Sequence, residues 1–428
     1  MSHVSIELPY GKSFLEVKIP TRNFAGELEC HDIPGVRDEL GEIQRAVENP
    51  IEKKRLCEIA SSGDTVSIVV TDITRRSPDH KILPSILKEL KSVGVHDEKI
   101  TIVTALGIHR PMTEEEIKLK IGSEAFKHIR TVNHNCHDKR QLMYLGETGN
   151  LKTPVWVNKT VAEADIKVTT GIVEIHTIAG YSGGGKSIMP GVSGEEAIMA
   201  THKPEWIDNP KAALGLIEGN PIHEDIVELA RMAGVDFIVN TVLNSRDELV
   251  CAAAGDVEEA QLNLIETYDR MYKVPLDEPA DIVVSAAGYP KDLNLYQASR
   301  AANNFVLVPK PTVKEGGIII IPAPCQDGVG DQLFYEWMRD AEKPQDVLER
   351  AYREYKIGVH KPYIMSKILA HADVILAGSQ IPDETVKEML MIPARNVEEA
   401  LEWALKKLGS DSRVLVAPHG FFTLPTLT

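Results

Sequence analysis

The sequence lacks the features that mark secreted and membrane-spanning proteins. The longest purely aliphatic run covers only residues 318–321, far too short to cross a bilayer. The opening MSHVSIELPYG alternates apolar and polar residues and has no apolar run of the signal-peptide kind. The cysteines are isolated and odd in number, which favours a reducing compartment over a disulfide framework. They are Cys30, Cys57, Cys136, Cys251 and Cys325. These absences predict a cytoplasmic protein.

An excess of positive charge is also missing. Among 428 residues the formal net charge is −16, and the acidic residues are spread along the chain. This balance argues against a nucleic acid or an anionic membrane as the main partner. Hydrophobic residues make up 43% and charged residues 26%, which is typical of a globular protein with a sizeable core. An anionic ligand would therefore need a locally basic pocket.

The hydrophobic pattern predicts two α/β domains with mainly parallel sheets. Residues 1–20 have the alternation of a β-hairpin, and a helix is expected over residues 84–93. Apolar segments separated by helical patterns indicate parallel strands. These segments are residues 66–70, 99–104, 164–169, 281–285, 316–322, 373–377 and 413–417. Two prolines near residues 272–279 indicate a linker.

We therefore expect an N-terminal domain over residues 1–272 and a C-terminal domain over residues 273–428. The last ten or so residues are expected to pack back on the first domain. Open α/β sheets bind ligands at the carboxyl ends of their strands, so we expect the active site in the interdomain cleft.

The segment GYSGGGKS, residues 180–187, satisfies the P-loop pattern G-x-x-x-x-G-K-[ST]. In a P-loop, the residues after the lysine open a long helix whose N-terminus favours phosphates. Here Pro190 and Gly191 follow within what should be the first two turns. Because proline lacks an amide hydrogen and clashes with the preceding turn, this context disfavours a nucleotide-hydrolysing loop.

Polar clusters follow several of the strand-like segments. TDITRR covers residues 71–76, GIHRP covers 107–111, and EIH at 174–176 leads into the glycine loop. ATHKP at residues 200–204 and GYPKDLNLYQASR at 288–300 complete the set. Two separate histidines are suited to paired acid and base work, and a lysine to covalent attachment of a carbonyl-bearing group. The group HNCH at 134–137 lacks a second ligand pair and does not have zinc-site spacing.

Taken together, these motifs resemble the lactate racemase family, the nickel-pincer-nucleotide-dependent 2-hydroxyacid racemases and epimerases. The resemblance covers nearly the whole chain. It rests on D-x-T-R at 72–75, G-x-H-R-P at 107–111 and A-x-H at 200–202, on G-Y-P-x-D-x-N-x-Y-Q at 288–297, and above all on the block E-x-H-x-x-A-G-[FY]-S-G-G-x-K-S-x-x-P-G at 174–191. Pro190 and Gly191, which disfavour a P-loop, belong to that block.

The resemblance implies a role for each matching residue. Lys186 would carry the nickel-pincer nucleotide as a covalent thioamide, and His202 would be the protein's ligand to nickel. His109 and His176 would be the acid–base pair, while Asp72 would position the cofactor or neighbouring cations. Arg75 and Gln297 would hold the substrate, a small 2-hydroxyacid. Enzymes that build the cofactor would be needed to load it, and a chain made without them is expected to lack it.

Three departures bear on the substrate. Lactate racemase carries lysine where this chain has Arg300, proline where it has Arg76, and tryptophan near the position of His360. Because an extra buried cation usually meets an anion, these changes favour a second carboxylate, with malate the simplest candidate and Arg300 as a further substrate-binding residue. Lactate and an aldonate of the gluconate type are the alternatives within the family. A P-loop-like NTPase or kinase, a non-catalytic carrier of the cofactor, and an α/β protein with purely structural histidines are the alternatives outside it.

Overall fold

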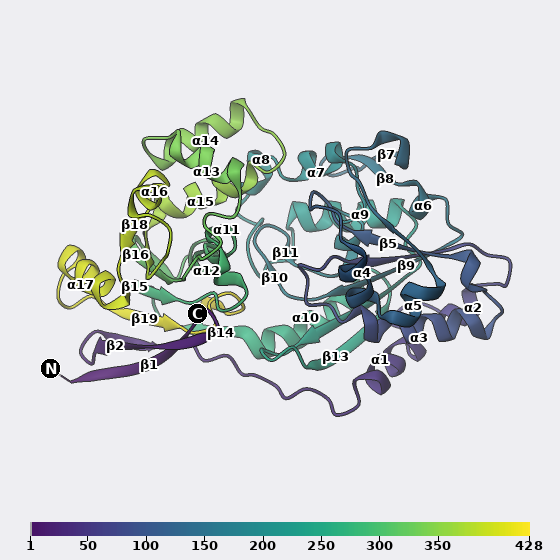
Figure 1. The fold of residues 1–428 in the computed structure, drawn as a ribbon, viewed down its shortest axis with the longest axis horizontal. Coiled ribbons are helices and arrows are strands. Elements are labelled where there is room, and N and C mark those ends of the chain that lie inside the picture. Colours follow the sequence, from purple (N-terminus) through teal and green to yellow (C-terminus); the bar gives the residue numbers. More distant parts are fainter. Residues whose placement is uncertain (1) are drawn as a thin grey trace. The chain divides into compact units, whose positions relative to one another are not determined.

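The computed structural model describes residues 2–428, which form two compact units (Figure 1). The central unit comprises Asp32–His202 and Ile217–Met271. The terminal unit comprises the chain up to His31, Lys203–Leu216 and Tyr272–Thr428. None of the helices within residues 2–428 has both the length and the apolar character that a bilayer crossing requires.

The central unit is built on a six-stranded sheet in the order β13-β12-β9-β4-β5-β6. All neighbouring strands are parallel except β12 and β13, which form an antiparallel pair. The strands are β4 (Val66–Thr71), β5 (Ile100–Ala105), β6 (Arg130–Asn133), β9 (Ile166–Ile172), β12 (Phe237–Leu243) and β13 (Leu249–Gly255). Since β4 and β9 are buried along almost their whole length, they have the continuous apolar character of a covered parallel sheet.

Helices and short strands surround this sheet. The main helices are α1 (Glu39–Glu48), α2 (Leu56–Ile59), α3 (Asp79–Ser92), α4 (Glu114–Ile121), α5 (Ser123–His128), α6 (Lys159–Ala162), α7 (Glu195–Thr201), α9 (Pro221–Met232) and α10 (Glu259–Tyr272). The short strands are β7 (Leu142–Glu147), β8 (Pro154–Asn158), β10 (Ile175–His176) and β11 (Gly180–Tyr181). The apolar faces of α1 and α3 close the core on the sheet through Ile43, Ile82 and Ile86.

The terminal unit contains a second six-stranded sheet, wholly parallel, in the order β18-β17-β16-β15-β19-β3. The strands are β3 (Phe24–Glu27), β15 (Ala280–Ser285), β16 (Val313–Pro322), β17 (Asp373–Ala377), β18 (Ile392–Ala394) and β19 (Val414–Ala417). The helices are α8 (Pro204–Ile207), α11 (Leu295–Ala298), α12 (Arg300–Val306), α13 (Gln332–Arg339), α14 (Pro344–Arg353), α15 (His360–His371), α16 (Asp383–Glu388) and α17 (Val397–Leu408).

The first residues of the chain belong to this terminal unit. The hairpin of β1 (His3–Tyr10) and β2 (Ser13–Pro20) packs Leu8 and Val17 into the same core as the sheet. Gly11 N donates to Asp292 Oδ2 at 2.6 Å, and Asn23 Nδ2 donates to the carbonyl of Ser412 at 2.9 Å. These bonds join the ELPYG opening to the GYPKD motif and to the C-terminal strand region.

The sequence-based fold class is confirmed: the chain is α/β with mainly parallel sheets, and the predicted strands and hairpin are present within a few residues. The predicted linker near 272–279 is instead strand β14 (Lys273–Leu276), which pairs in parallel with β20 (Leu424–Leu427). Both strands lie in the terminal unit, so the last residues of the chain pack within that unit. The contact grouping also differs from the expected domain 1–272, because the chain up to His31 and Lys203–Leu216 group with the C-terminal part.

A buried ion pair supports the loop that follows β4. Asp79 is fully buried and Lys120 is 5% exposed, and Lys120 Nζ lies 3.0 Å from Asp79 Oδ2. Lys120 also donates to the carbonyls of Arg75 and Ser77, both at 2.8 Å. The carboxylate accepts a further hydrogen bond from Thr71 Oγ1 at 2.7 Å. The pair therefore joins α3 and α4 to the loop that carries the D-x-T-R motif.

We expect Lys120→Met to destabilise the central unit by about 3–5 kcal/mol, because it leaves a buried carboxylate without its counter-charge. Urea unfolding followed by fluorescence and circular dichroism measures this. Lys118→Met is the matched control, since Lys118 is exposed on the same helix. Equal midpoints for the two variants would contradict the structural role of the pair.

Candidate active site

Three loops of the central unit carry most of the predicted site residues. They follow β4, β5 and β9, which are neighbouring parallel strands in the order β9-β4-β5. Their carboxyl ends therefore lie at one edge of the sheet, the usual place for a ligand in this architecture. The amide of Gly107 donates to the carbonyl of Gly191 at 2.9 Å, so the loop after β5 is bonded to the end of the glycine block.

Asp72 and His109 form a hydrogen-bonded pair across two of these loops. Asp72 Oδ2 accepts from His109 Nδ1, and Asp72 Oδ1 accepts from the Thr74 amide at 2.9 Å and its hydroxyl at 2.6 Å. Burial alone would raise the pKa of Asp72, but the hydrogen bond and charge of His109 outweigh it and lower the pKa to about 2. Since Nδ1–H of His109 faces a carboxylate, its Nε2 has the lone pair of a general base.

His176 ends the short strand β10 and has a different surrounding. The amide of Ala179 donates to His176 Nδ1 at 3.3 Å. In the neutral ring this places the proton on Nε2, from which His176 can donate to a ligand oxygen. The two histidines therefore differ in their neutral forms: one presents an acceptor nitrogen and the other a donor.

The glycine block folds into a tight turn instead of a P-loop. Gly184–Ser187 forms a single 3-10 turn, and no long helix follows it. The amide of Gly184 donates to Asn240 Oδ1 at 2.7 Å, and the amides of Lys186 and Ile188 bond to carbonyls within the loop. A Cβ at Gly185 would lie 2.8 Å from the carbonyl oxygen of Ile226, so glycine is required there by packing. These amides are engaged within the fold and do not form a phosphate cradle.

Lys186 lies on this turn, and its ammonium form is disfavoured. Burial, and then the neighbouring charge of Arg75, lower the pKa of Lys186 to about 7. At neutral pH a large fraction of the side chain is therefore an uncharged, nucleophilic amine. An amine in this state is suited to covalent attachment of an acyl-type group.

His202 follows α7 and presents one nitrogen in a fixed tautomer. Its Nδ1 lies 2.9 Å from the carbonyl oxygen of Ile198 and 3.0 Å from the hydroxyl of Thr201. Because a carbonyl only accepts, Nδ1 carries the proton and the lone pair is on Nε2. Burial, and then the charge of Lys186, lower the pKa of His202 to about 4. A neutral imidazole oriented by a backbone carbonyl is the usual form of a metal-binding histidine.

Sequence reasoning missed His223, a histidine close enough to Lys186 for that charge to act on it. His223, in the first turn of α9, is 4% exposed, and its Nε2 has no hydrogen-bond partner within residues 2–428. Burial, and then Lys186, lower its pKa to about 4. Asn220 caps the same helix and donates to the carbonyl of Ile178 at 3.0 Å. The signal was the N-P-x-H sequence, which places a histidine in a first helical turn.

Arg76 is not the additional substrate-binding cation that the sequence suggested. Its guanidinium donates to Glu174 Oε1 at 2.7 Å and to Asp247 Oδ1 at 2.8 Å. It also donates to the carbonyl of Asn244 at 3.1 Å. Because two carboxylates already neutralise it, Arg76 fastens the loop after β4 to the E-x-H segment that leads to His176.

The remaining predicted substrate residues belong to the terminal unit. The Oε1 atom of Gln297, on α11, is buried and has no hydrogen-bond partner within residues 2–428. Arg300 begins α12, and its guanidinium lies 4.3 Å from the centre of the Phe421 ring. His360 begins α15. An unpaired buried amide oxygen is costly, so the Gln297 side chain has the state expected of a residue that awaits a polar ligand.

The segment 134–137 has a structural role. His134 is buried, with Nε2 at 2.9 Å from the carbonyl of Ser193 and Nδ1 at 3.2 Å from Asn158 Nδ2. His137 is exposed and pairs with Glu195 at 2.8 Å. Within residues 2–428, no group of three or more His, Cys, Asp or Glu side chains is placed to hold a metal ion. A metal bound through His202 would therefore take most of its ligands from a cofactor.

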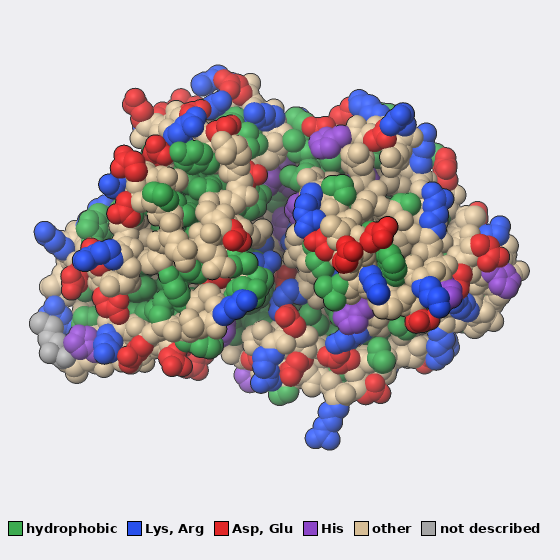
Figure 2. Space-filling view, viewed as in Figure 1, with side chains coloured by type: hydrophobic (Ala, Val, Ile, Leu, Met, Phe, Trp, Pro, Cys, Tyr) green, Lys and Arg blue, Asp and Glu red, His purple; other side chains and the backbone are tan. Residues whose placement is uncertain are grey.

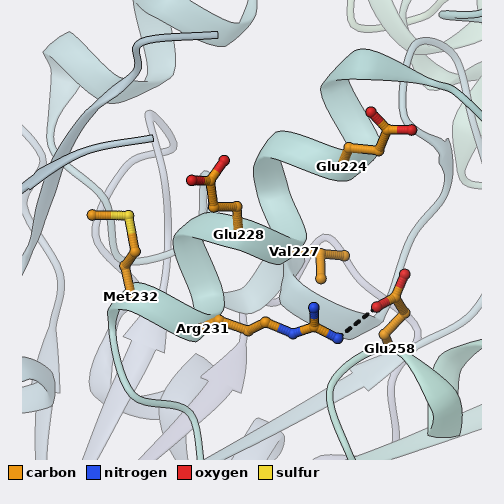
Figure 3. A pocket seen from close by; sticks show the side chains of 6 residues that line it. All are labelled: Glu224, Val227, Glu228, Arg231, Met232 and Glu258. Carbon is orange, nitrogen blue, oxygen red and sulfur yellow. Dashed lines mark hydrogen bonds and ion pairs between the residues drawn. The ribbon is translucent and has the colours of Figure 1, made fainter. Parts of the chain in front are cut away.

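A groove on the outer face of α9 has the wrong charge for an anionic substrate (Figure 3). Glu224 and Glu228 project from the helix, and the only basic residue lining the groove, Arg231, is paired with Glu258 at 2.6 Å. Over the face drawn in Figure 2, acidic and basic side chains lie interspersed. A carboxylate ligand would find more favourable charge near Lys186 and Arg75.

Comparison with known proteins gives one consistent result. Residues 10–215 match the family model of the lactate racemase N-terminal domain, and residues 276–424 match that of the lactate racemase C-terminal domain. A lactate racemase of Thermoanaerobacterium thermosaccharolyticum is 35% identical over 97% of this chain and 98% of its own length. One of Lactiplantibacillus plantarum is 33% identical over the same shares.

Comparison with solved structures gives the same family. The structure of the lactate racemase apoprotein from T. thermosaccharolyticum superposes with a TM-score of 0.91 at 34% identity, covering 99% of this chain and all of that one. The resemblance stated from the motifs is confirmed by matches over most of the sequence. The chain belongs to the lactate racemase family, and it is an isomerase.

Proposed function

We propose that this protein inverts the C2 centre of a 2-hydroxycarboxylic acid with the help of a nickel-pincer nucleotide carried on Lys186. The proposal is supported by one observation above all: a lysine with a pKa of about 7 and a histidine paired with Asp72 lie on loops at the same sheet edge. The two similar proteins from T. thermosaccharolyticum and L. plantarum are named lactate racemases, and lactate is a 2-hydroxycarboxylic acid.

The donor atoms of the central unit fit such a cofactor. The uncharged amine of Lys186 suits covalent attachment, and the Nε2 lone pair of His202 suits nickel already held by sulfur. Arg75 supplies a cation beside Lys186, as an anionic nucleotide or substrate carboxylate requires. Asp72 is already paired with His109, which supports a role in orienting that histidine in addition to any contact with the cofactor.

When bound, the cofactor would supply an acceptor for the C2 hydride and return it to the other face of the resulting 2-oxo acid. The chain's own residues manage the proton. His109 takes the hydroxyl proton at Nε2, and the Asp72 carboxylate stabilises the imidazolium that results. His176 would donate its Nε2–H to the substrate's hydroxyl or oxo oxygen, and it would be the second member of the acid–base pair. Arg75 would bind the substrate carboxylate beside Lys186, and Gln297 is proposed as a further substrate-binding residue.

The first expectation concerns Lys186 in the cofactor-free protein. Its reaction with a limiting pulse of acetic anhydride should rise with pH around a midpoint near 7, because burial disfavours the ammonium form. Arg75→Met should move the midpoint upward, since it removes a neighbouring positive charge. Peptide mass spectrometry measures both. When the cofactor-building enzymes are present, Lys186 should carry the adduct, and an active enzyme with unmodified Lys186 would refute the attachment.

The second expectation concerns nickel. His202→Ala should lose most of the metal, because Nε2 of His202 is the proposed protein ligand. His137→Ala is the control, since His137 is exposed and paired with Glu195. Metal analysis of protein loaded in the same way decides the point. Equal nickel in the two variants would exclude His202 as the ligand.

The third expectation concerns the acid–base pair. His109→Ala and His176→Ala should each lower racemisation in both directions by about 10²–10⁴-fold. Asp72→Asn should also lower it, because the side chain at position 72 no longer accepts the hydrogen bond of His109 Nδ1–H as a carboxylate. Chiral chromatography on protein with an equal Lys186 adduct gives the rates. Near-full activity in either histidine variant would overturn the mechanism.

A further inference from the structure

One face of α9 packs against the glycine turn that carries Lys186. A Cβ at Gly185 would lie 2.8 Å from the carbonyl oxygen of Ile226 and 3.0 Å from Cβ of Ala230, so the backbone of the turn is in direct contact with the helix. His223 lies three residues before Ile226 and seven before Ala230, a spacing that places the three residues on one face of α9. His223 is therefore on the face that meets the residue next to Lys186.

The imidazole of His223 is a buried polar group without a partner. The residue is 4% exposed, and its Nε2 forms no hydrogen bond within residues 2–428. A buried polar atom that is not bonded raises the free energy of the folded state. Packing alone does not require a histidine here, since an apolar ring fills a comparable volume without that cost. The side chain is understandable if Nε2 is bonded in another state of the protein.

The backbone amides at the start of α9 are already bonded. Pro221 has no amide hydrogen. The amides of Ile222 and His223 both donate to Asn220 Oδ1, at 3.1 and 3.2 Å. Nδ2 of Asn220 donates to the carbonyl of Ile178 at 3.0 Å, which fixes this end of the helix against the segment before the glycine turn. An incoming group would therefore meet the imidazole of His223 and not free helix amides.

The side chain of Lys186 can supply the missing partner. Burial, and then the charge of Lys186, lower the pKa of His223 to about 4, so the two side chains are close enough to interact. When an acyl-type group is attached, the lysine nitrogen loses its charge and keeps one hydrogen. A buried N–H of this kind needs an acceptor, and a neutral imidazole provides one on the ring nitrogen that carries no proton.

We propose that Nε2 of His223 accepts a hydrogen bond from the acylated nitrogen of Lys186 and so fixes the orientation of the group attached there. His223 is then a positioning residue, because it acts on the linkage and takes no part in proton transfer to the substrate. The inference rests on the proposed function in taking Lys186 as the point of attachment. It requires only an amide or thioamide linkage on that nitrogen.

A chain with Nε-acetyllysine at position 186 tests this bond without any cofactor. Nitrogen NMR of protein with isotopically labelled histidine should show the Nε2 resonance of His223 move upfield on acetylation, because that nitrogen gains a hydrogen bond. The His223→Gln variant identifies the resonance by its absence. The resonances of His134 should stay in place, since both of its ring nitrogens are already bonded. An unchanged His223 resonance overturns the inference.

Thermal unfolding measures the same bond energetically. His223→Phe should not lower the melting temperature of the unmodified protein, because Nε2 has no partner to lose. In the acetyllysine chain the same change should lower it by about 2–4 °C, because it leaves a buried N–H unpaired. His134→Phe is the matched control and should lower both melting temperatures equally, through loss of its bonds to Ser193 and Asn158.

Equal effects of His223→Phe on the two chains would make this histidine purely structural and overturn the inference. If the variant does not fold, as judged by circular dichroism, the resonance measured in the parent sequence decides the point.

The two proposals fail in different ways. If Lys186 never carries the cofactor while the acetyllysine chain shows the bond to His223, the proposed function is rejected and the positioning role stands. If the loaded enzyme is active and carries the adduct, but His223 does not respond to acetylation, the function is supported and the positioning role is rejected.

Discussion

The buried carboxylate of Asp79 is the contact on which the arrangement of the central unit depends. It accepts hydrogen bonds from Thr71 at the end of β4 and from Thr170 on β9, and it pairs with Lys120 of α4. Lys120 then holds the carbonyls on either side of Arg76. One charge pair thus fixes two strands, two helices and the loop that carries Asp72 and Arg75. In a low-dielectric interior such a network is worth keeping only when every member is satisfied.

The chemistry of the site depends on local charge that the composition conceals. The chain has a net charge of −16, yet burial and then the neighbouring Arg75 lower the pKa of Lys186, and burial and then the charge of Lys186 lower the pKa of His202. The acidic side chains lie elsewhere, and some of them form ion pairs, such as Glu174 with Arg76. A neutral amine and neutral imidazoles are the protonation states that acylation and metal binding require.

Much of the fold was predictable from the sequence because parallel strands buried on both faces are continuous apolar runs. The motifs likewise gave the family, and the central unit contains Asp72, His109, His176, Lys186 and His202. The roles of these residues stay predictions. The segment of β14 is predicted as a linker because of Pro275 and Pro279, whereas β14 pairs with β20, a strand about 150 residues away. Arg76 was misjudged because its partners Glu174 and Asp247 come from distant segments, and a sequence does not reveal which cation is already paired.

The pairing of β3, near the N-terminus, with β19, near the C-terminus, sets an order of events during synthesis. Asn23 bonds to the carbonyl of Ser412, 389 residues later, and β3 pairs with β19 in the same sheet. The core of the terminal unit is therefore incomplete until β19 has been synthesised. The central unit ends at Met271, so all of its strands are available by then. The hairpin of β1 and β2 must wait with Leu8 and Val17 unburied. Contacts between segments so far apart in the sequence slow folding, and the apolar face of the hairpin stays exposed until the sheet of the terminal unit has formed.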